Sequence, residues 1–413
     1  MTSAQEPKAL RLLPNQIAAA EHFYACFQAS PAFIATAPGR INFLGEHTDY
    51  NQGFVLPAAI DRTLSLAIAP RTDDGIRYFS ADFNERWTGS IASIPPALRQ
   101  WPDYINGVVA SFRNAGLPLA GFDLAFGSDL PMGAGMASSA ALEVATALAL
   151  TAAFGKPLDK LDLVRYAQLA ENKYLGVKSG ITDPFACIFG KAGNAVFLDC
   201  RSLKYEYLPV DLTAFALLLI GTGSTQTLTE EAYNLRREQC EAGVKALRKV
   251  YPQVKSLRDA NRAMIEYSLK DRVPDLIYHR CKYVVEENLR LQVSADALRR
   301  QDLVGFGKKM FATHAGLSKL YEVSCRELDF LVELARHEHA IVGARMMGGG
   351  FGAATINIVR KNLLSDVMNR IGESYRQEFG SLPNFQTCQL ADGADLSAVD
   401  QTNLGEMRYF GKL

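Results

Sequence analysis

A glycine-rich segment that runs directly into an apolar helix-forming stretch is the most informative part of this sequence. It reads Asp129-Leu-Pro-Met-Gly-Ala-Gly-Met-Ala-Ser-Ser-Ala140 and continues as ALEVATALAL. Gly133 and Gly135 allow backbone N–H groups to approach an anion closely, and Ser138 and Ser139 stand where the helix would begin. The unpaired N–H groups of a helix N-terminus form a phosphate site. The alternative is a structural turn with an N-cap serine before a buried helix.

Two familiar nucleotide-binding loops do not fit this segment. A Walker A loop requires a GK[ST] triplet after the glycines, and the chain contains none. A dinucleotide fingerprint requires a preceding βαβ context and a suitably spaced acidic residue, and neither is evident. A dehydrogenase is therefore a poor interpretation of the glycines.

Strand and helix patterns are mixed along the rest of the chain. Short apolar runs bounded by Gly, Pro or Asp predict strands at residues 33–36, 64–69, 122–126, 195–198, 215–220 and 354–359. Apolar periodicity predicts helices at residues 157–174, 229–250, 256–268, 276–291 and 303–321. Since strands and helices do not alternate regularly, an α+β fold is favoured over a doubly wound parallel sheet. Short strand-like runs dominate the first half of the chain and long helical segments the second. This change predicts two domains, residues 1–210 and 211–413.

Two further segments have compositions suited to binding. Ala37-Pro-Gly-Arg-Ile-Asn-Phe-Leu-Gly-Glu-His-Thr-Asp-Tyr50 combines cationic, acidic and imidazole side chains, which offer donors and acceptors for the hydroxyls of a sugar. A solvated loop could have the same composition. Met347-Gly-Gly-Gly-Phe-Gly352 precedes an apolar strand. Its glycines indicate that the backbone here approaches a ligand or another backbone segment closely. A tight bend between core elements is the alternative.

Composition narrows the class of protein. Of the 413 residues 48% are hydrophobic and 21% charged, which excludes a disordered chain, and the 44 basic residues balance 44 acidic ones. A zero net charge argues against nucleic acid or an anionic membrane as a partner. Seven scattered cysteines without a CxxC pair favour reduced thiols in the cytoplasm. The first residues have no continuous apolar region, so we expect no secretory signal.

Taken together, the three segments resemble the motifs of the GHMP small-molecule kinases, and among these the galactokinases. APGRINFLGEHTDYNQGFVLPAAID is similar to the galactokinase sugar signature, LPMGAGMASSAALEV to the phosphate loop, and MMGGGFGAATINIV to the third motif. Similarity extends over nearly the whole chain from about residue 34. The resemblance implies an α+β, two-domain GHMP kinase fold with the active site in the interdomain cleft.

The resemblance also implies an activity. It is the ATP-dependent phosphorylation of the C1 hydroxyl of galactose to galactose 1-phosphate, the first committed step of galactose catabolism. Phosphoryl transfer depends mostly on positioning and charge neutralisation, and Mg²⁺ would accompany ATP. The expected partners are therefore a small sugar and ATP, with no nucleic acid or membrane, and we expect a monomer.

Residue roles carry over by position in the motifs. Asp183 would be the general base and Arg40 would keep it ionised and stabilise charge on the transferring phosphoryl group. Ser139 and Glu171 would bind Mg²⁺ through hard oxygen atoms. The remaining implied residues are the sugar ligands Glu46, His47, Asp49 and Tyr233, the phosphate-loop residues Gly133, Ala134, Gly135, Ser138 and Ser139, and the weaker adenine-pocket matches Ser80 and Trp101.

One departure from the galactokinase pattern bears on specificity. Thr182-Asp183-Pro184 replaces the usual Met-Asp-Gln. Proline fixes its own φ and biases the residue before it towards extended backbone, so we expect Asp183 to be extended. The change keeps two alternatives open. One is a GHMP kinase for a related sugar such as arabinose, N-acetylgalactosamine or a modified galactose, and the other is a catalytically silent galactose and ATP sensor.

Overall fold

The computed structural model describes residues 12–131, 135–223, 230–350 and 354–399. The first part of the chain is built on a six-stranded sheet with the order β13-β1-β3-β6-β4-β5. All neighbouring strands are antiparallel except β4 and β6, which are parallel. The strands are β1 Phe33–Asn42, β3 Pro57–Pro70, β4 Gly75–Ser80, β5 Glu85–Ser90, β6 Phe122–Ser128 and β13 Asp395–Ala398.

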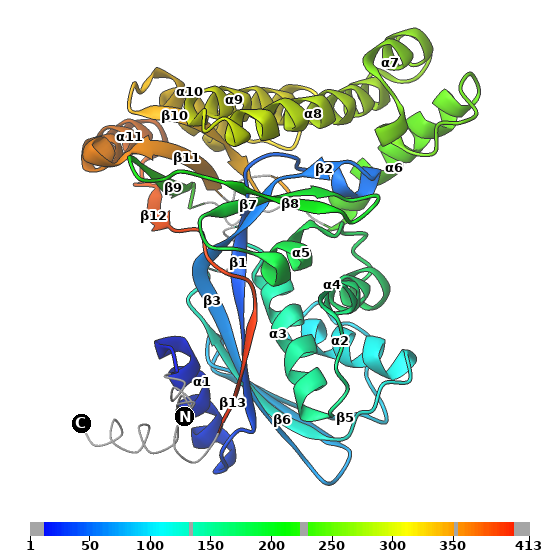
Figure 1. Cartoon of the computed structure of the whole chain (residues 1–413), viewed down its shortest axis with the longest axis vertical. Coiled ribbons are helices and arrows are strands. Elements are labelled where there is room, and N and C mark those ends of the chain that lie inside the picture. The colour runs from blue at the N-terminus through cyan, green and yellow to red at the C-terminus, as the bar shows by residue number, and fades with distance from the viewer. Residues whose placement is uncertain (1–11, 132–134, 224–229, 351–353, 400–413) are drawn as a thin grey trace, which may run out of the picture.

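Helices cover both faces of this sheet (Figure 1). Because successive side chains of a strand point to opposite faces, Ile34 packs against α1 while its neighbour Ala35 joins the larger core on the other side. The helices are α1 Pro14–Phe27 on one face and, on the other, α2 Pro102–Asn114, α3 Ser138–Ala153, α4 Lys160–Leu169 and α5 Thr182–Phe189.

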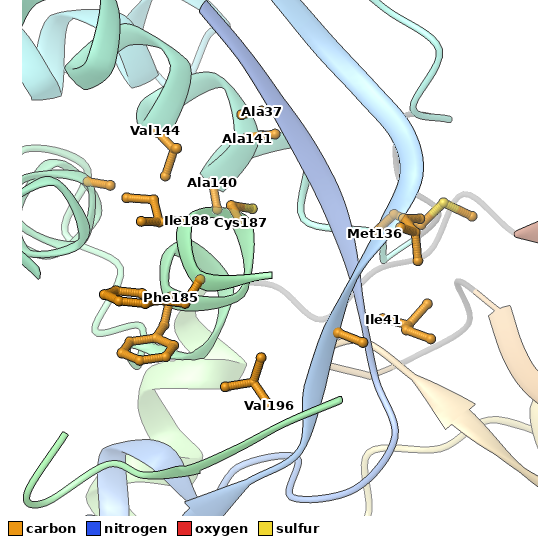
Figure 2. Packing of buried hydrophobic residues seen from close by; sticks show 14 of the residues in the cluster. Ala37, Ile41, Met136, Ala140, Ala141, Val144, Phe185, Cys187, Ile188 and Val196 are labelled. Atoms are coloured by element: carbon orange, nitrogen blue, oxygen red, sulfur yellow. The ribbon is translucent and has the colours of Figure 1, made fainter. Parts of the chain in front are cut away.

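Helix α3 is buried almost all round, as the apolar run ALEVATALAL predicts. Figure 2 shows Ala140, Ala141 and Val144 of α3 beside Cys187 and Ile188 of α5, near strand β1. Small alanine side chains let the backbones of α3, α5 and β1 approach closely. Packing of this density fixes where the first turns of α3 and α5 lie, and those turns carry Ser139 and Asp183.

The second part of the chain is a four-stranded antiparallel sheet with the order β10-β11-β9-β12 and a layer of helices. Leu218 and Ile220 of β9 pack against α10 and α11, whereas Leu217 and Leu219 join the core of the first part. The elements are β9 Phe215–Gly221, β10 Ile341–Met347, β11 Ala354–Arg360, β12 Asn384–Cys388, α6 Glu230–Arg248, α7 Arg262–Ser268, α8 Asp275–Arg299, α9 Leu303–Lys319, α10 Arg326–His337 and α11 Leu364–Phe379. A small third sheet, β2-β7-β8, consists of β2 Phe54–Val55, β7 Asn194–Asp199 and β8 Tyr205–Pro209.

The end of the chain returns to the first sheet. Strand β13, the red strand that runs beside β1 in Figure 1, pairs with β1 in antiparallel register. A division into residues 1–210 and 211–413 therefore needs one amendment, because the last strand lies with the first part. The boundary near residue 210 itself, in the link between β8 and β9, stays a prediction.

Most expected elements are present with longer bounds, and two helices differ from expectation. Residues 256–268 form a 3-10 turn, Leu257–Asp259, and then α7, because the Asn261 side chain caps a new helix by accepting from the Met264 N–H. Residues 157–174 form α4 from Lys160 and then a π-helix, Ala170–Leu175. A π-helix inside a helical run is often a functional feature, and this one carries Glu171.

Candidate active site

Arg40 and Asp183 form a bidentate ion pair. The Nε and Nη2 atoms of Arg40 donate to the two carboxylate oxygens of Asp183, each at 2.8 Å. Arg40 lies on β1 just after a register shift, and its side chain is only 6% exposed. Burial lowers the pKa of Arg40, but the charges of Asp183 and Glu46 outweigh burial and leave that pKa raised. The guanidinium is therefore always charged.

The expectation of an extended Asp183 is wrong. Asp183 is the second residue of α5 and Pro184 is the third. The N–H groups of a first helical turn have no partner within the helix, so a proline there removes no helical hydrogen bond. The fork of Arg40 holds the carboxylate, and this contact together with the helix outweighs the local bias of a residue before proline.

The Arg40–Asp183 pair faces an open cavity of about 140 Å³. The cavity brings together segments far apart in the chain: the loop after β1, the π-helix, the first turn of α5, helix α6 and the glycine run after β10. Its lining contains every predicted sugar ligand. The lining residues are Arg40, Gly45, Glu46, His47, Asp49, Glu171, Val177, Ser179, Gly180, Thr182, Asp183, Tyr233 and Gly349.

Glu46 is held by a buried arginine that the sequence reasoning missed. The Nη2 atom of Arg345, on β10, donates to Glu46 Oε1 at 2.9 Å, and the Gly348 N–H donates to the same oxygen at 3.2 Å. Burial alone would raise the pKa of Glu46, but the charges of Arg345 and Arg40 lower it below its ordinary value. Glu46 is therefore ionised at neutral pH. A single arginine in the otherwise apolar strand Ile341–Met347 was the available signal.

His47 is the centre of an ordered hydrogen-bond chain. Its Nε2 lies 2.9 Å from the Gly349 carbonyl oxygen and its Nδ1 lies 2.9 Å from the Tyr50 hydroxyl. Burial lowers the pKa of His47 to about 4, so the ring is neutral at pH 7. Since a carbonyl only accepts, Nε2 carries the proton and Nδ1 accepts from Tyr50. The Tyr50 oxygen in turn lies 2.7 Å from the Tyr321 hydroxyl.

Asp49 and Tyr233 complete the wall of the cavity. Asp49 Oδ2 accepts from the Thr182 hydroxyl at 2.7 Å, and Asp49 Oδ1 accepts from the Tyr50 N–H at 2.9 Å. Burial raises the pKa of Asp49, while these hydrogen bonds act in the opposite direction. The Tyr233 ring, on α6, lies 5.5 Å from the rings of both His47 and Tyr50. Asp49 and Tyr233 were predicted as sugar ligands from the sequence, whereas the hydrogen bond from Thr182 to Asp49 was not.

The phosphate-loop residues lie beside the ion pair. The Nη1 atom of Arg40 donates to the Gly135 carbonyl oxygen, and Ser138 and Ser139 are the first two residues of α3. The glycine run reaches the same place, because a Cβ on Gly348 would lie 3.2 Å from the Cα of Gly135. This close approach is what its glycines predict. Gly133 and Ala134 lie outside the described residues.

Ser139 and Glu171 face one another, as a shared metal ion would require. Ser139 Oγ lies 3.4 Å from Glu171 Oε1. Burial raises the pKa of Glu171 to about 7. One helical turn along α3, neither carboxylate oxygen of the buried Glu143 has a hydrogen-bond partner among the described residues. Burial raises the pKa of Glu143 well above its ordinary value, and the charges of Glu171 and Asp183 add to the effect.

The raised pKa values of Glu171 and Glu143 indicate that no cationic group stabilises their ionised forms fully, and a divalent cation would supply that charge. Within the described ranges, no group of three His, Cys, Asp or Glu side chains could hold a metal ion by itself. Mg²⁺ is ordinarily bound by one or two protein ligands together with substrate phosphates and water. The hydroxyl of Ser139 and the carboxylate of Glu171 therefore fit Mg²⁺ that arrives with a nucleotide.

A second, less polar cavity of about 240 Å³ opens beside the start of α3. Trp101 lines it, with its ring 6.4 Å from that of Phe83 at an interplanar angle of 12° and its Nε1–H donating to Glu85 at 2.9 Å. Ser138 and Ser139, at the start of α3, also line this cavity. Ser80 is fully buried at the end of β4 and is not among the lining residues. Its part in an adenine pocket stays a prediction.

Three protein-family models match the chain. They are the GHMP kinases N terminal domain at residues 103–191, the galactokinase galactose-binding signature at residues 21–70 and the GHMP kinases C terminal domain at residues 294–377. The Methanococcus jannaschii mevalonate kinase structure shares the fold, with a TM-score of 0.60 at 18% identity over 88% of this chain and all of its own. The chain therefore matches both the N-terminal and the C-terminal models of the GHMP kinases and shares their fold.

Relatives with higher sequence identity show which family within the GHMP kinases the chain belongs to. A Thermotoga maritima galactokinase is 41% identical over 86% of this chain and 98% of its own, and a Roseiflexus galactokinase is 38% identical over 90% and 95%. The structure of Lactococcus lactis galactokinase complexed with galactose superposes with a TM-score of 0.87, at 31% identity over 91% of this chain and 98% of its own. The chain is a member of the galactokinase family.

Helices long and apolar enough to cross a membrane are not found in the described part of the chain.

Proposed function

We propose that this protein transfers the γ-phosphoryl group of ATP to the C1 hydroxyl of galactose. The observation that carries the proposal is the bidentate Arg40–Asp183 pair, which faces a cavity lined by the sugar signature and contacts Gly135 of the phosphate loop. Membership of the galactokinase family and the match to the galactose-binding signature support the choice of sugar. ATP is the co-substrate of that family.

In this proposal Asp183 accepts the proton of the C1 hydroxyl as the oxygen attacks phosphorus. Arg40 holds both carboxylate oxygens in place, which fixes the base and favours its ionised form. The same guanidinium stabilises negative charge on the transferring phosphoryl group. Its contact with the Gly135 carbonyl joins the base to the phosphate loop, so a single side chain relates the positions of the two reactants.

We propose that Glu46, Asp49 and Tyr233 bind the sugar hydroxyls and that His47 presents its ring to the sugar. Ionised carboxylates accept hydrogen bonds from hydroxyls, and the tyrosine hydroxyl can donate or accept. Both nitrogens of His47 are engaged by Tyr50 and Gly349, so its ring shapes the cavity wall.

For the nucleotide we propose that the backbone of residues 133–135 and the first turn of α3 hold the phosphates, and that Trp101 contacts the base. Ser139 and Glu171 would hold Mg²⁺, which when bound neutralises charge on the phosphates. We further propose that the protein acts as a cytoplasmic monomer on small molecules only.

A sugar panel tests the proposal. Purified protein is incubated with ATP and Mg²⁺ and with galactose, arabinose or N-acetylgalactosamine, and ADP release is followed by a coupled assay. We expect galactose to give the highest kcat/KM. Turnover of another sugar with galactose left untouched would establish a related sugar kinase, and binding without turnover of any sugar would establish a sensor.

A further inference from the structure

Thr182 donates twice to one carboxylate oxygen at the cavity wall. Its hydroxyl lies 2.7 Å and its backbone N–H 3.4 Å from Asp49 Oδ2. The opposite oxygen of Asp49 accepts from the Tyr50 N–H at 2.9 Å. Thr182 is buried, so its hydroxyl bond is protected from competition with bulk water.

The chain around Thr182 is shaped to admit this carboxylate. A Cβ built on Gly180 would lie 1.7 Å from Asp49 Oδ2, so any side chain there would displace Asp49. Gly180 therefore leaves space for the carboxylate and Thr182 sets its rotation. Donors on both oxygens restrict the directions in which the remaining lone pairs of Asp49 can point, and Asp49 lines the cavity.

The threonine contact is a departure from the galactokinase pattern, in which methionine stands before the catalytic aspartate. A methionine side chain has no donor to offer a carboxylate. The backbone N–H of residue 182 would remain with methionine, but the shorter bond, from the hydroxyl, depends on this chain's own residue.

We propose that Thr182 is a specificity-determining positioning residue, which fixes the Asp49 carboxylate in the orientation that receives one hydroxyl of the sugar. The inference rests on the proposed function, because it assumes that Asp49 binds the sugar. Thr182 acts through Asp49 and does not itself touch the transferred phosphoryl group. Its loss should therefore affect sugar binding more than the chemical step.

The test compares Thr182→Val, which keeps the shape but removes the hydroxyl, with Thr182→Ser, which keeps the hydroxyl. A hydrogen bond to a charged group predicts a KM for galactose raised about 10- to 100-fold in Thr182→Val. We expect kcat and the KM for ATP to be little changed, and Thr182→Ser to restore the KM for galactose.

Thr36→Val is the matched control, because Thr36 is a buried threonine on β1 whose hydroxyl bonds to Ser65 at 3.0 Å outside the cavity lining. We expect it to lower thermal stability without changing the KM for galactose. Thermal melts of all three variants separate a folding defect from a binding defect.

A panel of 2-, 3-, 4- and 6-deoxygalactose gives the sharpest readout. The ratio of KM between Thr182→Val and wild type should fall close to one for the single deoxysugar that lacks the hydroxyl bound by Asp49. An equal ratio for all four sugars, a parallel loss in kcat, or a Thr182→Ser variant as impaired as Thr182→Val would overturn the inference. A wild-type protein inactive on galactose would instead refute the proposed function.

Discussion

Replacing Arg345 by methionine should destabilise the protein strongly, although Arg345 is not part of the Arg40–Asp183 ion pair. Arg345 is fully buried, and besides Glu46 it donates to the carbonyl oxygens of Asn42 and Met346. Removing one partner of a buried ion pair costs about 3–5 kcal/mol, because the remaining charge is left uncompensated. We expect Arg345→Met to lose about that much free energy of unfolding at pH 7.

The pH dependence of the stability loss shows whether the uncompensated charge of Glu46 causes it. In the wild type the pKa of Glu46 is lowered, so its contribution to stability is present above its ordinary value of 4.5 and is lost as the pH falls through the folded value. In Arg345→Met the effect of burial prevails and raises the pKa of Glu46. The deficit should then be largest at neutral pH and should shrink as the pH is lowered towards 5.

Urea unfolding at pH 7 and pH 5 measures these differences. The matched control is Arg376→Met, since Arg376 forms an exposed pair with Glu373 at 2.6 Å, and we expect it to cost less than about 1 kcal/mol. Adding Glu46→Gln to Arg345→Met should recover stability at pH 7 and remove the pH dependence of the deficit. If Arg345→Met costs no more than Arg376→Met, the buried pair does not have the assigned strength.

Three further predictions concern the two cavities. Asp183→Ala should lower kcat about 10²- to 10⁴-fold while galactose binding, followed by calorimetry, is retained; unchanged turnover would exclude Asp183 as the base. Because burial lowers the pKa of His47 to about 4, its contribution to stability should be present above pH 6.5 and be lost as the pH falls towards 4. An NMR titration in which the His47 ring protonates near pH 6.5 would contradict this. Trp101→Ala should raise the KM for ATP about 5- to 100-fold through lost stacking without changing the KM for galactose, and equal effects on both would show that Trp101 supports the fold alone.

Local sequence patterns predicted much of the fold. The buried helix α3, the strands β1, β6 and β9 and the long helices of the second part follow from apolar periodicity and from Gly, Pro and Asp at their ends. The π-helix at Ala170–Leu175 and the break before α7 were not predicted, because caps and tertiary contacts decide how a helical run is divided. Strand β13 could not be assigned to the first sheet, since its partner β1 is more than 350 residues away in the chain.

The candidate site, like the fold, could be predicted from the sequence only in part. Its chemistry can be predicted from the sequence, because the segments that carry Arg40, Glu46 and Asp183 contain the residue types that phosphoryl transfer and sugar binding require. The residues that hold and orient these groups cannot be predicted from the sequence, because they lie on elements far away in the chain. Arg345 reaches Glu46 from β10, and Thr182 reaches Asp49 from α5.

The sequence by itself therefore determined the class of fold, the family and the residue types available for the reaction, since all three depend on short contiguous segments. Only the tertiary structure decided the helical state of Asp183, the direction of the hydrogen bonds around His47 and the burial of Glu143. Orientation, protonation and burial depend on which segments meet, and such contacts between distant parts of the chain are set by packing of the whole core.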